Sequence, residues 1–197
     1  MKLLTNLLLI FVFYICIYSQ PDSVNQVIFY DYCPFECCQF GEWIIKENIN
    51  VYPTENDTSS VIFELNNDET IYAKTGNLHF SQVGKVVVTK PIYGYKLNDT
   101  LLAFNCQESS FLVKHNDIEK YVDIFWPISF YDKDDTEENY QKEIKKGKYS
   151  GKMIQRPKTI WWVKIESNKG KGWIKLVNKT PYCFALDEKI IGMDACE

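Results

Sequence analysis

Aromatic side chains offer the clearest chemistry in this sequence, and that chemistry is binding. They make up 15% of the chain. Aromatic rings line grooves that bind extended or proline-rich peptides, and their flat faces also stack on sugars. Burial is the competing interpretation for any single ring, because each ring removes roughly 150–250 Å2 of surface from water in a core. The candidate ligand-binding residues are Tyr52, Trp126, Trp161 and Trp162.

Two of these candidates, Trp161 and Trp162, are neighbours in a segment that alternates like a β-strand. Residues 161–166 predict one strand, residues 167–170 a turn and residues 172–176 a returning strand. Side chains on a strand point alternately to opposite faces, so the two rings cannot share a face. We therefore expect one tryptophan in a core and the other on an outer surface or groove, and the sequence leaves open which is which.

Catalytic chemistry has little support in the sequence. His79 and His115 are the only histidines, and a Cys–His pair would need a reduced cysteine, which an exported chain with an even set of cysteines disfavours. Neither a GxSxG elbow nor an HExxH motif occurs. We expect a protein that is not an enzyme and needs no cofactor. A hydrolase whose site is assembled only by folding is the alternative.

Two segments could bind a metal, and both depart from the required pattern. Residues 132–143 place oxygen-bearing side chains at several positions of an EF-hand-like calcium loop, but Glu137 stands where the loop needs glycine. The cysteines from Cys33 to Cys38 are dense, yet their spacing does not match the paired CxxC set of a zinc site. We expect a solvated charged loop in the first case, disulfides in the second, and no metal.

Cysteine usage indicates an oxidising compartment. An even set of cysteines remains once residues 1–19 are set aside, and in an exported chain such a set predicts disulfides. Cys37 and Cys38 are neighbours, so we expect each to reach a different partner. Because the cysteines gather near both ends of the chain, we expect the amino-terminal cluster to be bonded to the carboxy-terminal tail. The disulfide candidates are Cys33, Cys37, Cys38, Cys106, Cys183 and Cys196.

Residues 1–19 predict a signal peptide. Lys2 precedes an apolar run that ends at Tyr18, and Ser19 supplies a small residue at the cleavage position. The run is shorter than the roughly 20 residues that a membrane helix needs, so an uncleaved anchor is the alternative. We expect an exported protein, periplasmic or secreted, with no membrane span after cleavage. The formal net charge of −4 and the lack of a basic stripe argue against nucleic acid as a partner.

The remainder of the chain predicts an all-β fold. Apolar and polar residues alternate over short runs, and turns rich in Asn, Asp and Gly separate these runs. Residues 131–158 differ, because they are crowded with Asp, Glu and Lys and predict a long charged insertion. The expected strands fall near residues 43–45, 49–52, 61–65, 70–74, 84–89, 110–114 and 119–125.

Two segments resemble bacterial Src-homology-3-like (SH3b) domains. Residues 161–176 are similar to their closing strands, and residues 172–173 supply the glycine–tryptophan pair that begins a strand after the distal turn. Residues 49–73 are similar to their opening strands, with a Tyr-Pro pair at 52–53 where the family usually has arginine, glycine and proline. The chain also resembles a group of small exported, cysteine-containing proteins of Bacteroidetes type. These resemblances imply small β-barrels that bind cell-envelope peptides or glycans and carry no catalytic residues.

The sequence thus predicts two small SH3-like barrels in tandem. The first, with its cysteine-rich lead, spans residues 20–92. The second spans residues 93–197, with the charged insertion 131–158 and a cysteine-bearing tail. The expected function is non-catalytic recognition of a cell-envelope peptide or glycan, of peptidoglycan type, through the aromatic surface. A secreted inhibitor or protein-interaction factor that acts through the charged insertion is the alternative.

Overall fold

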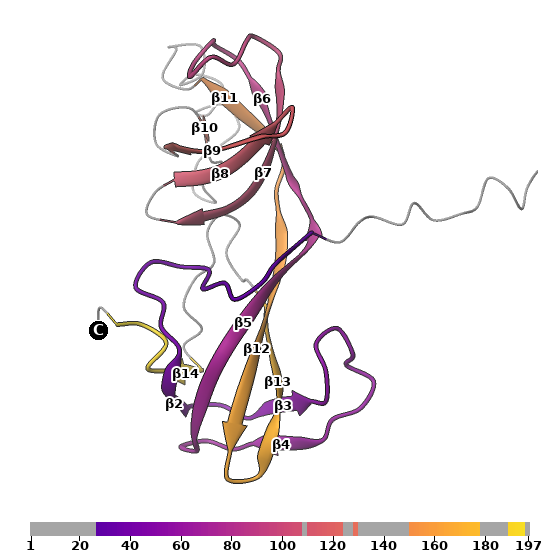
Figure 1. Ribbon diagram of the computed structural model, residues 1–197, viewed down its shortest axis with the longest axis vertical. Coiled ribbons are helices and arrows are strands. Elements are labelled where there is room, and N and C mark those ends of the chain that lie inside the picture. Colours follow the sequence, from indigo (N-terminus) through magenta and orange to yellow (C-terminus); the bar gives the residue numbers. More distant parts are fainter. Residues whose placement is uncertain (1–26, 108–109, 124–127, 130–149, 178–188, 196–197) are drawn as a thin grey trace, which may run out of the picture.

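The described part of the chain is built from β-strands and the turns between them, which confirms the all-β expectation. The structure is a computed structural model, and it describes residues 27–107, 110–123, 128–129, 150–177 and 189–195. The strands form two sheets, which lie one above the other in Figure 1. No described segment forms a helix long and apolar enough to cross a membrane.

Several residues singled out from the sequence lie outside this description. The backbone of Cys106 is described as part of a strand, but its side chain is not. The expectations that concern such positions stay predictions. The residues that lie wholly outside the described part of the chain are Trp126, Cys183, Cys196, the expected signal peptide 1–19 and residues 131–149 of the charged insertion.

The first sheet combines strands from both ends of the described chain. Its order is β14–β2–β5–β12–β13–β3–β4, with β1 also paired to β5, and these pairings are antiparallel. Buried and exposed residues alternate along most of its strands, which is the pattern of a sheet with one face in a core. The strands are β1 (Val27–Phe29), β2 (Gly41–Ile45), β3 (Ile49–Tyr52), β4 (Phe63–Leu65), β5 (Thr70–Gln82), β12 (Lys158–Ser167), β13 (Gly170–Val177) and β14 (Ile190–Ile191).

The hairpin expected from the sequence forms within this sheet. β12 and β13 stay in register from Ile160, opposite Val177, down to Gly170 at the turn. Gly170 has a φ of 141°, a backbone conformation that residues with a side chain rarely adopt. Gly172 lets β3 approach closely, because a Cβ there would lie 2.4 Å from Cγ1 of Val51. Close packing of strands therefore explains the glycine of the glycine–tryptophan pair.

The second sheet lies between β5 and β12 in the chain. Its order is β10–β11–β6–β7–β8–β9, and the pairing of β10 with β11 is parallel. Val83 alone separates β5 from β6, and residues 156–157 separate β11 from β12. Two stretches of chain therefore run almost unbroken from one sheet into the other (Figure 1). The strands are β6 (Gly84–Val88), β7 (Thr100–Gln107), β8 (Ser110–His115), β9 (Ile118–Asp123), β10 (Ile128–Ser129) and β11 (Gly151–Gln155).

The strand pairing differs from the tandem order expected from the sequence. The closing hairpin was expected to complete a barrel formed by residues 93–197. It pairs instead with β5 and β3, which lie before residue 92 in the chain. Period-two alternation predicts where strands lie but not which strands pair, because pairing is decided by packing between segments that are far apart in the chain.

Each sheet has an apolar core of its own. The core of the first sheet is the larger and includes Trp161, whose ring centroid lies 5.9 Å from those of Trp43 and Phe35. A buried residue of β7, Phe104, joins this core, with its ring centroid 5.6 Å from those of Phe29 and Phe80. Phe104 therefore ties the second sheet to the first. The smaller core of the second sheet contains Val86, Val88, Tyr95, Leu101, Ala103, Phe111 and Val113.

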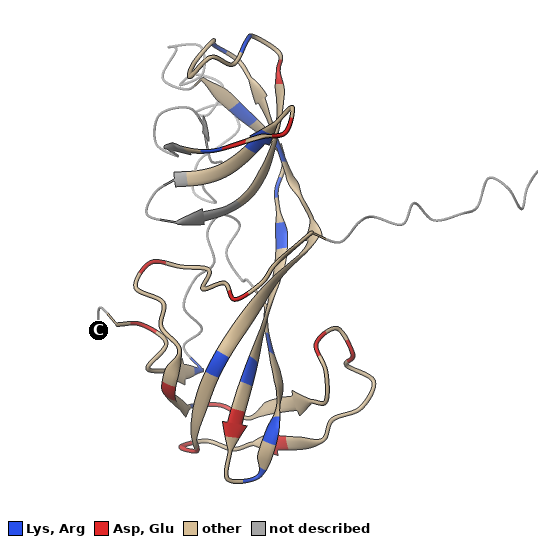
Figure 2. Ribbon diagram, viewed as in Figure 1, with Lys and Arg blue, Asp and Glu red and all other residues tan. Residues whose placement is uncertain are grey.

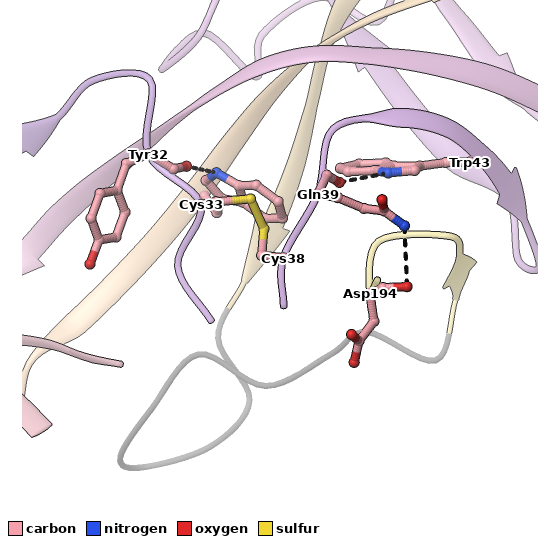
Figure 3. The surroundings of a disulfide bond; sticks show 7 residues. Tyr32, Cys33, Cys38, Gln39, Trp43 and Asp194 are labelled. Atoms are coloured by element: carbon pink, nitrogen blue, oxygen red, sulfur yellow. Dashed lines mark hydrogen bonds between the residues drawn. A yellow bond between two sulfur atoms is a disulfide. The ribbon is translucent and has the colours of Figure 1, made fainter. Parts of the chain in front are cut away.

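The amino-terminal cysteines are oxidised in the structure. Cys33 and Cys38 form a disulfide with their Cα atoms 5.6 Å apart (Figure 3), and Cys37 is disulfide-bonded as well. Cys37 and Cys38 thus do not bond to each other, as expected. One bridge is local to the cluster, whereas a disulfide to the tail stays a prediction because Cys183 and Cys196 lie outside the described residues.

The carboxy-terminal tail nevertheless packs against the cysteine cluster through its backbone. The N–H of Ala195 donates to the carbonyl oxygen of Cys37, and the N–H of Gln39 donates to the carbonyl oxygen of Met193, both at 2.8 Å. The side-chain amide of Gln39 also donates to the carbonyl oxygen of Asp194 at 3.3 Å (Figure 3). The carboxy-terminal end of the described chain therefore lies against the cysteine cluster, beside β2 of the first sheet.

Candidate ligand-binding face

The two adjacent tryptophans lie on opposite faces of β12, as strand geometry requires, but both are buried. Trp161 is 0% exposed and Trp162 is 1% exposed. The expectation that one of them faces an outer surface or groove is therefore wrong. The reason is a second layer of side chains on the outer face of the first sheet, which the pattern of β12 alone does not predict.

Trp161 belongs to the core of the first sheet. Its indole N–H donates to the carbonyl oxygen of Tyr32 at 2.9 Å, so its polar group is satisfied inside the protein. On the neighbouring strand β5, Gly76 makes room for the ring, because a Cβ there would lie 2.2 Å from the indole nitrogen. These contacts give Trp161 a structural role and leave no ring face for a ligand.

Trp162 belongs to the second layer. The ring of Tyr52 meets it edge to face with centroids 5.7 Å apart, and Nζ of Lys175 lies 5.9 Å from its ring centroid. Its buried indole N–H has no hydrogen-bond partner among the described residues. The structure therefore brings Tyr52 and Trp162 together and separates both from Trp161. Of these three candidates, Tyr52 is the one that is partly exposed.

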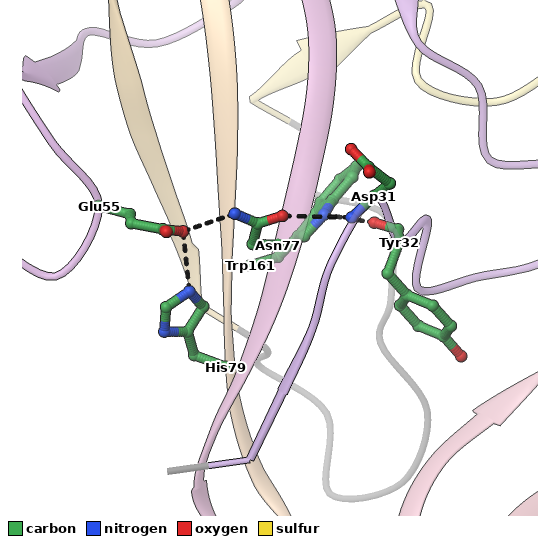
Figure 4. Close-up of polar contacts among 6 residues, drawn as sticks. All are labelled: Asp31, Tyr32, Glu55, Asn77, His79 and Trp161. Atoms are coloured by element: carbon green, nitrogen blue, oxygen red, sulfur yellow. Dashed lines mark hydrogen bonds and ion pairs between the residues drawn. The ribbon is translucent and has the colours of Figure 1, made fainter.

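A polar network around the buried Asn77 and His79 forms the rest of this layer (Figure 4). One carboxylate oxygen of Glu55 accepts a hydrogen bond from the amide of Asn77 at 2.8 Å and lies 2.9 Å from Nε2 of His79. The amide oxygen of Asn77 in turn accepts from the backbone N–H of Asp31 at 3.2 Å. His79 is 1% exposed, so the network supports packing of the loop after β3. Among the described residues, no group of three or more His, Cys, Asp or Glu side chains could hold a metal.

Trp173 faces outward, and it is not among the four candidate ligand-binding residues predicted from the sequence. Ile174 and Leu176 of β13 point into the core, so Trp173 points to the outer face, where it is partly exposed. It lies opposite Tyr52 on β3 and Lys164 on β12, with Nζ of Lys164 6.0 Å from its ring centroid. The alternation along β13 was the available signal, because Trp173 has the opposite parity to its two apolar neighbours.

Aromatic rings and lysines alternate across the outer face of the first sheet. Tyr72 on β5 is 52% exposed, and Nζ of Lys74 lies 4.2 Å from its ring centroid. Figure 2 shows lysines on β5, β12 and β13 in this sheet. We name this surface the aromatic–lysine face, and it consists of Tyr52, Tyr72, Lys74, Lys164, Glu166, Lys171, Trp173 and Lys175.

The charges on this face are unevenly matched. The carboxylate of Glu166 lies 2.6 Å from Nζ of Lys171 and 3.3 Å from Nζ of Lys74, and hydrogen bonds from these two lysines hold its pKa below the ordinary value. Lys164 and Lys175 have no carboxylate partner among the described residues, and each lies over a tryptophan ring instead. Two positive charges on the face are therefore available to a ligand.

A pocket opens beside the face where β3 and β13 separate. The two strands pair at Trp173 and Ile174 of β13, and beyond these pairs lies a pocket of about 280 Å3. This volume is near the lower limit for sites that bind small molecules. Tyr52 and Lys175 belong to both the pocket and the face, so the two are continuous. The polar lining of the pocket comprises Asn48, Asn50, Tyr52, Lys175 and Lys189.

The aromatic–lysine face and its pocket are the strongest functional feature of the described residues. They combine ring surfaces, amides and ammonium groups, which can stack on a ligand and form hydrogen bonds with it. No protein-family model, curated protein or solved structure matches this chain. The SH3b resemblance therefore stays an expectation, and a function has to be argued from the face and the pocket themselves.

Proposed function

We propose that this protein is an exported, non-catalytic binding module that binds a cell-envelope peptide or glycan on the aromatic–lysine face. The observation that carries the proposal is the partly exposed Trp173, set between Tyr52 and Lys164 on one face of the sheet. A flat ring offers a large contact area, and a ring that is already ordered loses little entropy when a ligand binds.

The packing beneath Trp173 supports this proposal. Its neighbours in the strand, Gly172 and Ile174, are buried, so the backbone that carries the ring is anchored in the core. On the outer face, Tyr52 rests on the buried Trp162. Two layers of packing therefore fix the rings in place before a ligand arrives, which is the arrangement expected of a preorganised site.

We also propose that the architecture is a divergent form of two SH3-like barrels, the first of which is built from segments that lie before and after the second in the chain. The strong twist of β5 and β12 in Figure 1, and the short strands β3 and β4 that extend the same sheet, support the proposal for the first sheet. An experimental structure in which the edge strands β14 and β4 lie far apart would contradict a barrel for this sheet.

Co-sedimentation with insoluble polymers tests the binding function. The protein is mixed with purified peptidoglycan, chitin or cellulose, and the bound fraction is measured for the wild type, Trp173→Ala and Tyr72→Ala. We expect each variant to bind about 5- to 150-fold more weakly, if a sugar ring gains from one aromatic ring the roughly 1–3 kcal/mol that a stacked nucleobase gains. The unfolding midpoint should change little, because both side chains face outward.

Tyr121→Ala is the matched control for this experiment. Tyr121 on β9 of the second sheet is 52% exposed, as is Tyr72 on the face. Binding that survives Tyr121→Ala but is lost in Trp173→Ala supports the proposal. Equal binding by the wild type and Trp173→Ala would exclude the face as the binding site.

A further inference from the structure

The lysines of the aromatic–lysine face indicate which class of ligand it binds. Lys74, Lys164, Lys171 and Lys175 lie on this face with Glu166, and Glu166 pairs with Lys74 and Lys171. Glu42 and Glu64 lie on the same side of the sheet toward its two ends, on β2 and β4, and the carboxylate of Glu55 on this side is bound by Asn77 and His79. The middle of the face is therefore positive although the whole chain has a formal net charge of −4.

The two lysines without a carboxylate partner lie next to the rings. Nζ of Lys164 lies 6.0 Å from the ring centroid of Trp173, and Nζ of Lys175 lies 5.9 Å from that of Trp162. Trp162 is buried, so the apolar ring partly shields one side of the Lys175 ammonium group from water. A charge-assisted hydrogen bond to an anion would be stronger here than at a fully solvated lysine.

The pocket adds neutral hydrogen-bonding groups beside Lys175. The side chains of Asn48 and Asn50 are exposed and make no hydrogen bond among the described residues. An amide offers both donors and an acceptor, so these two residues can bind hydroxyl groups and carboxylate oxygens alike. Lys189 also lines the pocket but pairs with Glu47, so Lys175 is the cation there that the structure leaves without an acidic partner.

We propose that the ligand is an acidic polysaccharide, an inference that rests on the binding function proposed above. Its sugar rings lie against Trp173 and Tyr72, and an acid group reaches Lys175 in the pocket while a second one meets Lys164. Stacking rings, uncommitted amides and unpaired ammonium groups each match one chemical feature of such a polymer, namely the ring face, the hydroxyl groups and the acid groups. Nucleic acid fits less well, because a chain of negative net charge offers few cations for a polyphosphate backbone.

The test compares a charged polymer with its neutral form. The full chain is titrated with polygalacturonate and with its methyl ester, at low and at physiological salt. We expect polygalacturonate to bind and the ester to bind at least roughly tenfold more weakly, the effect of losing about one charge-assisted hydrogen bond. Binding of the acid form should weaken as salt rises, because the charges are exposed.

Charge variants assign this effect to the face. Lys164→Gln with Lys175→Gln should weaken binding of polygalacturonate at least roughly tenfold. Lys85→Gln with Lys90→Gln is the matched control, since Lys85 on β6 and Lys90 in the bend after β6 are both exposed and the net charge changes equally. We expect this control to change binding by no more than about twofold.

Three outcomes separate this inference from the binding function itself. If the ester binds as well as the acid, and Trp173→Ala abolishes both, the binding function stands and the acidic ligand is wrong. A single-stranded oligonucleotide that binds more tightly than polygalacturonate, and loses binding in the Lys164 and Lys175 variant, overturns the choice of polymer. If polygalacturonate, its ester and the insoluble envelope polymers all fail to bind, both proposals are wrong.

Discussion

The two sheets differ in how many of their faces are packed. The first sheet has a large core on one face, and on the other it carries the layer formed by Tyr52, Trp162 and the Glu55 network. The second sheet has a smaller core and exposes apolar side chains such as Leu102 and Tyr121. The candidate ligand-binding face thus lies on the sheet that is packed from both sides, where a ring can be presented in a fixed position.

The two sheets also differ in how they depend on each other. Phe104 lies in a strand of the second sheet but is buried in the core of the first, beside Phe29 and Phe80. No equivalent residue of the first sheet is found in the core of the second among the described residues. We therefore expect damage to the first core to spread to both sheets and damage to the second core to remain more local.

The largest expected effect is that of Trp161→Ala. Removing this fully buried ring should cost about 3–5 kcal/mol of the free energy of unfolding, and it removes the hydrogen bond from the indole to the carbonyl of Tyr32. Phe111→Ala removes an equally buried ring from the second core. Hydrogen exchange should show lost protection in both sheets for the first variant and mainly in β7 to β9 for the second. If β2 and β5 keep their protection in Trp161→Ala, the expectation that damage to the first core spreads is wrong.

Phe104→Ala tests the tie between the sheets directly. The ring is 4% exposed, so its loss should cost about 3 kcal/mol. Because the contact with Phe29 and Phe80 disappears, denaturant unfolding should change from one transition into two. Leu112→Ala offers a milder second variant, since Leu112 of β8 packs against the same core. A single, merely shifted transition in the Phe104 variant would show that the sheets are coupled by other contacts.

Glu55→Ala probes the outer layer that distinguishes the first sheet. The change removes the carboxylate that binds the buried amide of Asn77 and lies against Nε2 of His79, which should cost about 1–3 kcal/mol. The exposed Glu42→Ala is the control and should change the unfolding free energy by no more than about 0.5 kcal/mol. If the two variants unfold at the same denaturant concentration, the network adds nothing to the stability of the first sheet.

The smallest expected effect concerns Glu166 and pH. Its pKa is lowered in the folded protein from an ordinary value of 4.5 by hydrogen bonds from Lys171 and Lys74. A carboxyl group with a lowered folded pKa stabilises the fold above pH 4.5, and this contribution disappears as pH falls through the folded pKa. Glu166→Gln should therefore lower stability slightly at neutral pH, leave it nearly unchanged at low pH, and so flatten the acid limb of the stability curve.

Glu166→Gln also tests the proposal of an acidic ligand. The variant releases Lys74 and Lys171 and makes the face more positive. We expect tighter binding of polygalacturonate at neutral pH, with a steeper dependence on salt. Weaker binding by this variant would show that Glu166 itself contacts the ligand, in conflict with an acidic ligand on this face.

Local properties of the chain were predictable from the sequence. Period-two alternation and turn residues are read from a few neighbours, so the all-β class and the hairpin at 161–176 follow from them. The opposite orientation of Trp161 and Trp162 follows for the same reason. The outward orientation of Trp173 was also available, since Ile174 and Leu176 mark the buried face of β13.

Non-local contacts were not predictable in this way. The hairpin pairs with β5 and β3, and Trp162 is buried because Tyr52 lies on its ring beside the Glu55 network. These partners are distant in the sequence, and nothing in a strand's own pattern names the segment that will cover its outer face. The sequence alone therefore establishes that two adjacent tryptophans point apart. The tertiary structure decides that both are buried and that Trp173 remains at the surface, because burial depends on what packs against each face.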